Sequence, residues 1–301
     1  MVTRQSVDRM RCARAITWII VAGLLSIWQP SASRAAAPQD RFFTSSDGVR
    51  LHYIEAGPTK ARSIVLVPGW TMPAWIFERQ IADLSAQFHV IAFDPRGQGD
   101  SAVPSSGYEH NRRGADIGDL LTHLGGEPVL LVAWSLGVLD SLAYMQNAGD
   151  RRIAGLVLVD NSIGEEPPPT PPKPRPPGPK LTWAQDMQRF VRTMFAKAPA
   201  PAWLNRLTTD CLRMPEAAAK ALLAYPVPRS YWKGAVYATS RPVLYIVRPK
   251  FAGQASNLAA HHPTAESVVL SDLGHALFVD DAPRFNRMIR DFAARKVWPR
   301  A

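Results

Sequence analysis

The stretch "LLVAWSLGVLDSLAYM", from Leu130 to Met145, places a serine where an apolar strand pattern changes directly into a helical one. Ser135 would therefore lie on a sharp strand-to-helix turn. Such a turn requires small residues two positions before and after the serine, where Ala133 and Gly137 stand. It would hold the serine oxygen out at the edge of a sheet, beside a helix N-terminus that favours negative charge. This pattern predicts a nucleophile, and the alternative is a serine that only caps the helix.

A serine is a weak nucleophile at neutral pH and needs a base within hydrogen-bond reach. The segment "SVVLSDLGHALFVDDAPRFN", from Ser267 to Asn286, offers one, because a strand pattern runs into Gly274 and His275 and a helical pattern follows. We expect His275 to point back at Ser135. A surface or structural role is expected for the other histidines, which are His52, His89, His110, His123, His261 and His262.

A carboxylate ends another apolar run. "IAGLVLVD" begins at Ile153 and stops at Asp160, and a buried strand that ends in an acid needs a partner for that charge. Asp160 could orient the histidine, or it could cap a turn through its own side chain. Glu165 is the reserve candidate for the acid.

The elements that would position these residues alternate along the chain. Near-continuous apolar runs, each typical of a strand buried on both faces, are separated by helical spacings. The predicted strands are 49–57, 63–69, 88–94, 128–134, 153–160, 241–247 and a last one that begins at Ser267. The predicted helices are 75–87, 110–125, 136–149, 182–195 and 282–296. This order predicts an α/β fold with a mostly parallel sheet and helices on both faces, and ligands bound at the carboxyl ends of the strands.

With these motifs in place, the chain from Phe42 to Lys296 resembles the α/β-hydrolase family. The family's nucleophile pattern is G-x-S-x-G, and here Ala133 takes the place of the first glycine. "FDPRGQGDS", from Phe93 to Ser101, matches the family's D-x-R-G-x-G-x-S. The resemblance implies an eight-stranded sheet, a helical cap, and a catalytic triad with the histidine in the loop around His275.

The resemblance also bears on the acid. In many members it follows the strand after the cap, but the stretch 243–262 contains no Asp or Glu. A family variant places the acid one strand earlier, which gives the order Ser135, Asp160, His275. In that triad the acid holds the imidazole in the tautomer that accepts the serine proton.

Further site residues follow from the same resemblance. The oxyanion donors would be the backbone N–H groups of Leu136 and Trp70, with "PGW" in place of the usual His-Gly-x. Trp134 is expected to line the substrate pocket. Asp94 and Arg96 are expected to pair and fix their loop. No cofactor is expected, and no metal, because no HExxH, paired CxxC or dense carboxylate loop occurs.

The N-terminus predicts export. Arginines precede the apolar run from Ala15 to Trp28, and the small-residue stretch "SASRAAA" follows, which is the order of a signal peptide. We therefore expect a periplasmic or secreted protein, and the alternative is a membrane anchor formed by an uncleaved segment. Removing 1–37 lowers the net charge from +10 to +6, because five arginines and one aspartate lie there. The charges are scattered, so no nucleic-acid partner is expected.

A proline tract interrupts the alternation of strands and helices. "EEPPPTPPKPRPPGPK" is typical of a stiff extended spacer, although it could also dock another exported protein. The predicted parts are a signal peptide over 1–37, the first part of the α/β core over 38–164, this linker over 165–180, a helical cap over 181–240 and the second part of the core over 241–301.

Together these features predict a serine hydrolase that cleaves an ester, lactone or thioester of a small molecule through an acyl-enzyme on Ser135. The alternative is a non-catalytic relative that uses its pocket to bind a small molecule or a partner.

Overall fold

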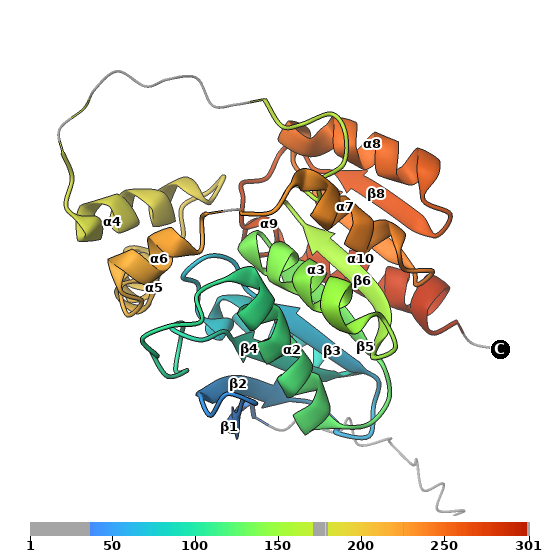
Figure 1. Ribbon diagram of the computed structural model, residues 1–301, viewed down its shortest axis with the longest axis horizontal. Helices are drawn as coiled ribbons and strands as arrows, with labels where there is room; N and C mark the ends of the chain where they lie inside the picture. The colour runs from blue at the N-terminus through green and yellow to red at the C-terminus, as the bar shows by residue number, and fades with distance from the viewer. Residues whose placement is uncertain (1–36, 171–177, 179, 225, 300–301) are drawn as a thin grey trace, which may run out of the picture. The chain divides into compact units, whose positions relative to one another are not determined.

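The computed structural model describes residues 37–170, 178, 180–224 and 226–299 (Figure 1). The predicted signal peptide lies outside these residues except for its last position, as does half of the proline tract 165–180. A single eight-stranded sheet runs through the described chain in the order β1-β2-β4-β3-β5-β6-β7-β8. Its first two pairings are antiparallel and the rest are parallel. The predicted mostly parallel sheet is confirmed.

The strand bounds are β1 Gln39–Thr44, β2 Arg50–Ala56, β3 Ser63–Val67, β4 His89–Asp94, β5 Val129–Trp134, β6 Ile153–Val159, β7 Val243–Val247 and β8 Ala265–Val269. β1 was not predicted from the sequence. It is an edge strand whose side chains are mostly exposed, so its apolar pattern is weak.

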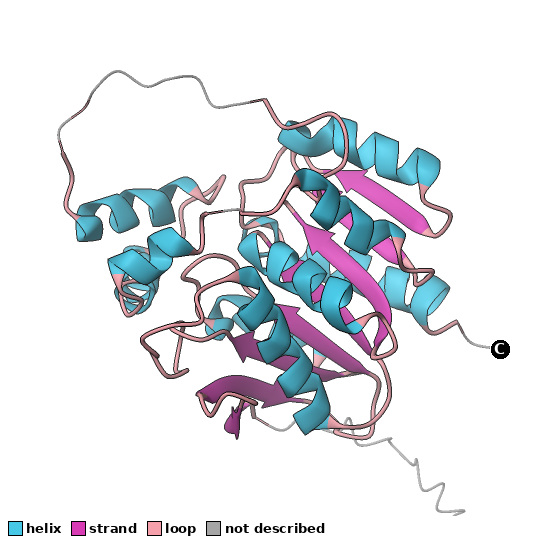
Figure 2. Ribbon diagram, in the orientation of Figure 1, coloured by secondary structure: helices cyan, strands magenta, loops and turns pink. Residues whose placement is uncertain are grey.

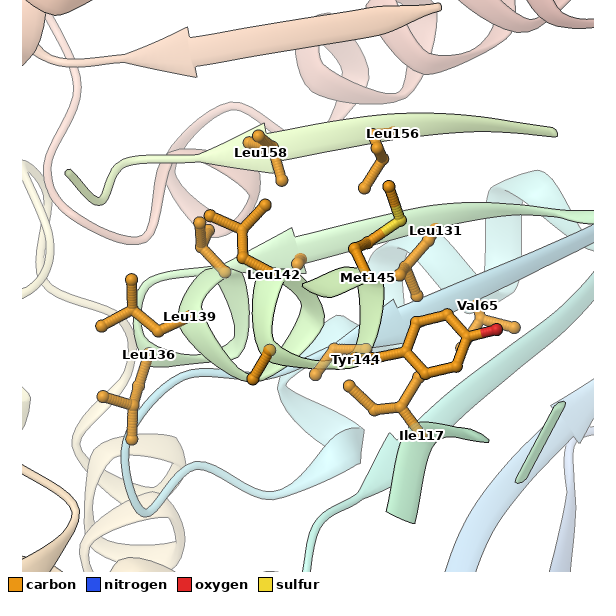
Figure 3. Packing of buried hydrophobic residues seen from close by; sticks show 14 of the residues in the cluster. Val65, Ile117, Leu131, Leu136, Leu139, Leu142, Tyr144, Met145, Leu156 and Leu158 are labelled. Carbon is orange, nitrogen blue, oxygen red and sulfur yellow. The ribbon is translucent and has the colours of Figure 1, made fainter. Parts of the chain in front are cut away.

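Neighbouring residues of the central strands face opposite layers of core, because side chains alternate across a strand. Val65 packs in one hydrophobic cluster, whereas Ile64 and Leu66 pack in the other. Figure 3 shows the first cluster, in which α3 lies against β5 and β6 with Leu142 and Met145 between them. The sheet therefore has a buried layer on each face, which explains why its strands read as continuous apolar runs.

Helices cover both faces of the sheet (Figure 2). The first cluster is completed by α2, α3, α7 and α8, and the second by α1, α9 and α10. The bounds are α1 Glu78–Leu84, α2 His110–Leu124, α3 Leu136–Ala148, α8 Ala252–His261, α9 Leu277–Asp280 and α10 Ala282–Phe292. Short 3₁₀ turns precede α1 (Ala74–Phe77) and α8 (Pro249–Phe251), and a π-helical turn, Ala293–Val297, follows α10.

The segment between β6 and β7 is helical. Its bounds are α4 Trp183–Thr193, α5 Pro201–Cys211, α6 Glu216–Ala221 and α7 Arg229–Tyr237. Thr182 and Gln185 form a capping box that begins α4. α7 packs against α3 on the face of the sheet, so the part of the segment that stands over the carboxyl ends of the strands is α4 to α6 (Figure 1). Among the described residues, no helix combines the length and the apolar character needed to cross a membrane.

Candidate active site

Ser135 occupies the turn between β5 and α3 with φ 54° and ψ −124°, a backbone conformation that is uncommon for a residue with a side chain. Hydrogen bonds hold the turn on both sides. The Ser135 amide donates to the carbonyl of Val159 at 2.8 Å, and the Ser135 carbonyl accepts from Nδ2 of Asn161 at 2.9 Å. A Cβ at residue 137 would lie 2.6 Å from the carbonyl oxygen of Pro68, so the close approach of two loops requires Gly137.

His275 lies between β8 and α9, in a loop that is fixed from two directions. The amide of Gly274 donates to Oδ2 of Asp280 at 2.6 Å, and the indole of Trp134 donates to the carbonyl of His275 at 2.8 Å. A Cβ at residue 274 would lie 2.5 Å from the carbonyl oxygen of Met194. Glycine is therefore required because the backbone after α4 passes directly over this loop.

Asp160 follows the last residue of β6 and is buried. Its φ of 50° lies in the left-handed region, which Asp tolerates better than most residues. Its amide donates to the carbonyl of Ile246 in β7 at 2.9 Å. The carboxylate accepts at both oxygens from Arg248, from the backbone N–H on Oδ1 at 3.0 Å and from Nε on Oδ2 at 2.6 Å.

The three side chains form one hydrogen-bonded line. The Oγ of Ser135 is 2.9 Å from Nε2 of His275, and Nδ1 of His275 is 2.6 Å from Oδ2 of Asp160. Burial acts to raise the pKa of Asp160, but its hydrogen bond to His275 and the charge of Arg248 outweigh burial and hold that pKa below its usual range. An ionised acid at this end of the line favours the tautomer with the proton on Nδ1, which leaves Nε2 free to accept from the serine.

The loop after β3 lies against the nucleophile. A Cβ at residue 69 would come within 2.9 Å of the Cβ of Ser135, so Gly69 permits close contact between the two backbones. Trp70 follows directly in that loop. Leu136 is the first residue of α3, a position whose N–H has no partner within its helix. The loop that carries Trp70 thus lies against the turn that carries Ser135 and Leu136.

An aromatic pocket of about 400 Å³ adjoins Trp70. Trp183 and Phe190 of α4 pack edge-on against the Trp70 ring, with ring centroids 5.8 and 5.1 Å away. The rest of the lining is mixed and comprises the apolar Met187 and Leu223 and the polar Asp186, Arg189, Thr193 and Lys220. Trp70 is held in place because its indole donates to the carbonyl of Ala219 at 2.7 Å. The pocket therefore lies between the predicted oxyanion loop and the helices over the strand ends.

Trp134 does not line this pocket. Its side chain is 1% exposed and packs behind His275, with the two ring centroids 5.1 Å apart. The expectation that it is a pocket wall is corrected. Position 134 is the last residue of β5, and its side chain points into the second hydrophobic cluster against Phe278.

Asp94 and Arg96 do not pair with each other, contrary to expectation. Asp94 accepts from Nδ1 of His52 at 2.7 Å and from two backbone amides, whereas Arg96 forms ion pairs with Asp116 and Asp47. The hydrogen bonds of Asp94 and the ion pairs of Arg96 nevertheless both fix the loop after β4. Among the residues that the structure describes, no three His, Cys, Asp or Glu side chains are grouped so that they could hold a metal ion.

Glu165, the reserve candidate for the triad acid, lies elsewhere. It is fully buried and accepts from Nζ of Lys233 at 2.8 Å, from the hydroxyl of Tyr237 at 2.5 Å and from Nδ2 of Asn257 at 2.8 Å. Burial raises the pKa of its carboxyl, but these bonds dominate and lower the pKa to about 2. Glu165 therefore anchors the chain at the start of the proline tract to α7 and α8.

Glu165→Gln is expected to weaken the fold only above strongly acidic pH. The lowered pKa means that the ionised group stabilises the folded state above its unfolded pKa of about 4.3, and that this contribution is lost as pH falls toward 2. We expect a loss on the order of 2 kcal/mol at pH 7 that disappears near pH 2. Urea unfolding of the wild type and of Glu165→Gln at several pH values measures this loss. A difference in the free energy of unfolding that does not depend on pH would contradict this role of Glu165.

Arg248, Asn161 and Asp280 were not predicted as site residues from the sequence. Only Arg248 has a local signal, because it follows β7 directly, at the place where many members of the family carry the acid and this chain does not. The side chains of Asn161 and Asp280 bind backbone groups, the carbonyl of Ser135 and the amide of Gly274 respectively. Such side-chain contacts to the backbone have no recognisable pattern in the sequence.

Comparisons with known proteins agree with this architecture. A sequence model described as "Alpha/beta hydrolase family" matches residues 64–288. A putative non-heme chloroperoxidase of Synechocystis sp. is 32% identical over 116 residues, which cover 38% of this chain and 41% of that protein. A soluble epoxide hydrolase of Corynebacterium sp. is 35% identical over 100 residues, 33% of this chain and 34% of that protein. The matched segments thus span only about a third to two fifths of these relatives.

Solved structures match over much more of the chain. A putative aryl esterase from Burkholderia cenocepacia superposes with a TM-score of 0.70 at 22% identity and covers 85% of this chain and 98% of that one. A bromoperoxidase from Bacillus anthracis gives a TM-score of 0.70 at 20% identity, with 84% and 99% covered. At such identities the likeness establishes the fold, while the activity has to be argued from the site.

Proposed function

This chain belongs to the α/β-hydrolase family, and from that premise we propose that it is a serine hydrolase that cleaves an ester-like bond. The observation that carries the proposal is the hydrogen-bonded line from Ser135 through His275 to Asp160. A serine, a histidine and an acid in this geometry have the parts that nucleophilic acyl transfer needs, namely a nucleophile, a base that takes its proton and a group that orients the base.

In the proposed reaction, Oγ of Ser135 attacks the substrate carbonyl carbon while Nε2 of His275 takes the hydroxyl proton. The tetrahedral intermediate collapses, the carbon–oxygen bond to the alcohol breaks, and the imidazolium returns the proton to the leaving oxygen. Water then attacks the acyl-enzyme with the same base, which releases the acid and restores Ser135. Asp160 stays ionised throughout and stabilises the imidazolium, in keeping with its lowered pKa.

The negative charge on the carbonyl oxygen would be stabilised by the backbone N–H groups of Trp70 and Leu136. The close contact between Gly69 and Ser135 supports this assignment. The substrate would be an ester, lactone or thioester with an apolar group that fits the aromatic pocket beside Trp70. This reaction requires neither a metal nor an organic cofactor.

Two activities named among the relatives give sharper alternatives. Epoxide hydrolases of this family use an aspartate as nucleophile, and the serine at position 135 argues against that chemistry here. The relative named as a putative non-heme chloroperoxidase leads us to a second alternative, in which hydrogen peroxide accepts the acyl group in place of water. Peracid formation from an ester and hydrogen peroxide, assayed beside simple hydrolysis, distinguishes the two acceptors.

A second class of function is the non-catalytic binding of a small molecule or partner in the aromatic pocket. The two functions differ in the reactivity of Ser135. We expect a fluorophosphonate probe to attach to Ser135 of the purified protein and peptide mass mapping to locate the adduct there. Folded protein without an adduct would refute the hydrolase proposal and favour the binding protein.

We further propose that the protein is exported, periplasmic or secreted, with a retained N-terminal anchor as the alternative. The order of arginines, apolar run and small residues in 1–37 supports export. N-terminal sequencing of protein from the soluble extracytoplasmic fraction would show a new terminus near position 37, whereas full-length protein in the membrane fraction would show the anchor.

A further inference from the structure

The loop that carries Trp70 contains an unfavourable turn. Residues Gly69 to Met72 form it, closed by a hydrogen bond from the Met72 amide to the Gly69 carbonyl at 3.2 Å. Thr71 inside the turn has φ 62°, a left-handed conformation that is a genuine outlier for a β-branched residue. Such a backbone persists only when its surroundings hold it, so some contact outside the turn must do so.

Gln98 provides that contact. Its side chain is fully buried, and Nε2 donates to the carbonyl of Gly69 at 3.0 Å and to the carbonyl of Met72 at 2.6 Å. One amide group therefore ties both ends of the turn, with one hydrogen for each carbonyl. Because Trp70 lies between those ends, the position of its N–H depends on these two bonds.

Arg113 sets the orientation of the Gln98 side-chain amide. Its Oε1 accepts from Nη1 of Arg113 at 2.7 Å, and a guanidinium can only donate, so Nε2 must face the two carbonyls. Arg113 of α2 is 1% exposed and is fixed by Asp140, which accepts from its Nε at 2.8 Å. The charged guanidinium also polarises the amide and strengthens its N–H bonds.

Asp140 links Arg113 to the helix that begins directly after Ser135. It lies in α3, the helix whose first residue is Leu136, and it is 1% exposed. His110 contacts its other oxygen, Nδ1 to Oδ1 at 2.7 Å. The buried chain Asp140–Arg113–Gln98 thus runs from the helix that carries the first predicted oxyanion donor to the turn that carries the second.

We infer that Gln98 is a positioning residue for the oxyanion hole: it sets the Trp70 N–H relative to the Leu136 N–H through its bonds to the Gly69 and Met72 carbonyls. The inference rests on the proposed serine hydrolase function. Two donors stabilise the oxyanion only if their separation suits it, and loss of one donor costs about 10²–10³ in kcat. A displaced donor should cost part of that factor.

The test uses Gln98→Met, which keeps the length of the side chain and removes its donors. The matched control is Gln254→Met, because Gln254 is equally buried and also donates to a backbone carbonyl, that of Pro167 at 3.1 Å. We expect kcat for a p-nitrophenyl ester to fall about 10- to 100-fold in Gln98→Met with KM nearly unchanged. The control should keep its kcat.

A second readout separates positioning from general damage. A trifluoromethyl ketone forms a tetrahedral adduct whose oxyanion occupies the hole, so its affinity should fall by the same factor as kcat/KM. Should Gln98→Met fail to fold, Gln98→Asn, which keeps an amide on a shorter side chain, takes its place, with a smaller parallel loss expected.

Each outcome is decisive. A folded Gln98 variant that keeps kcat and ketone affinity, or one that raises KM alone, overturns the inference. Failure of the proposed function would look different, since wild-type protein would then show neither ester hydrolysis nor fluorophosphonate labelling of Ser135.

Discussion

Ser135→Ala is expected to lower kcat for ester hydrolysis by about 10⁶-fold, the scale seen when a triad nucleophile is removed. The substitution removes the atom that forms the acyl bond, and His275 alone cannot supply a covalent intermediate. Alanine keeps the small volume at the turn, so the fold should survive. Steady-state kinetics with a p-nitrophenyl ester, together with the loss of fluorophosphonate labelling, measure the effect.

Ser141→Ala is the matched control. Ser141 lies in α3, the helix that begins directly after Ser135, and it is fully buried. Its hydroxyl makes no hydrogen bond to any residue that the structure describes. We expect its kcat to stay within about threefold of wild type, because it contacts neither the nucleophile nor the base. Retention of activity in Ser135→Ala would assign the reaction to another nucleophile and contradict the proposed mechanism.

The core of the fold and the meeting of Ser135, His275 and Asp160 could be predicted because their signals are local. β5 and β6 are buried on both faces, so their apolar runs are continuous, and the switch to α3 follows within one residue of β5. The turn at Ser135 needs small neighbours, and these stand at fixed offsets in the sequence. A buried acid at the end of a strand needs a partner for its charge, so Asp160 stands out in the sequence itself.

The errors have a different physical cause. Arg96 pairs with Asp116, twenty residues away on α2, and with Asp47, whereas Asp94 was expected to be its partner. Trp134 was expected in the pocket, but its side chain points from the end of β5 into the second hydrophobic cluster. In both cases the outcome depends on tertiary contacts that spacing does not encode.

The role of Arg248 illustrates the same limit at the site itself. The sequence shows that no acid follows β7, and the structure shows what stands there instead, a guanidinium and a backbone N–H that both bind Asp160. A carboxylate at the end of β6 is buried, so it needs charged or N–H partners to stay ionised. Arg248, the residue after β7, supplies these partners. An ionised acid can therefore stand at the end of β6 in place of the end of β7.

Asp160→Asn is expected to lower kcat by about 10⁴-fold with little change in KM. The reason lies in the contacts of the two oxygens. The backbone N–H of Arg248 faces Oδ1 and cannot move away, so the asparagine oxygen should stay there and its NH₂ should take the place of Oδ2. The Arg248 side chain is 31% exposed and can turn into solvent. The NH₂ group then faces Nδ1 of His275.

That arrangement puts the wrong tautomer in the site. Nδ1 must accept from the asparagine, so the imidazole proton moves to Nε2, which faces Ser135 and can no longer take the hydroxyl proton. Glu165→Gln makes the same change at the other buried carboxylate near this end of β6 and should keep kcat at neutral pH. Steady-state kinetics of Asp160→Asn and Glu165→Gln test this role of Asp160. A kcat for Asp160→Asn within tenfold of wild type would mean that Asp160 does not orient His275.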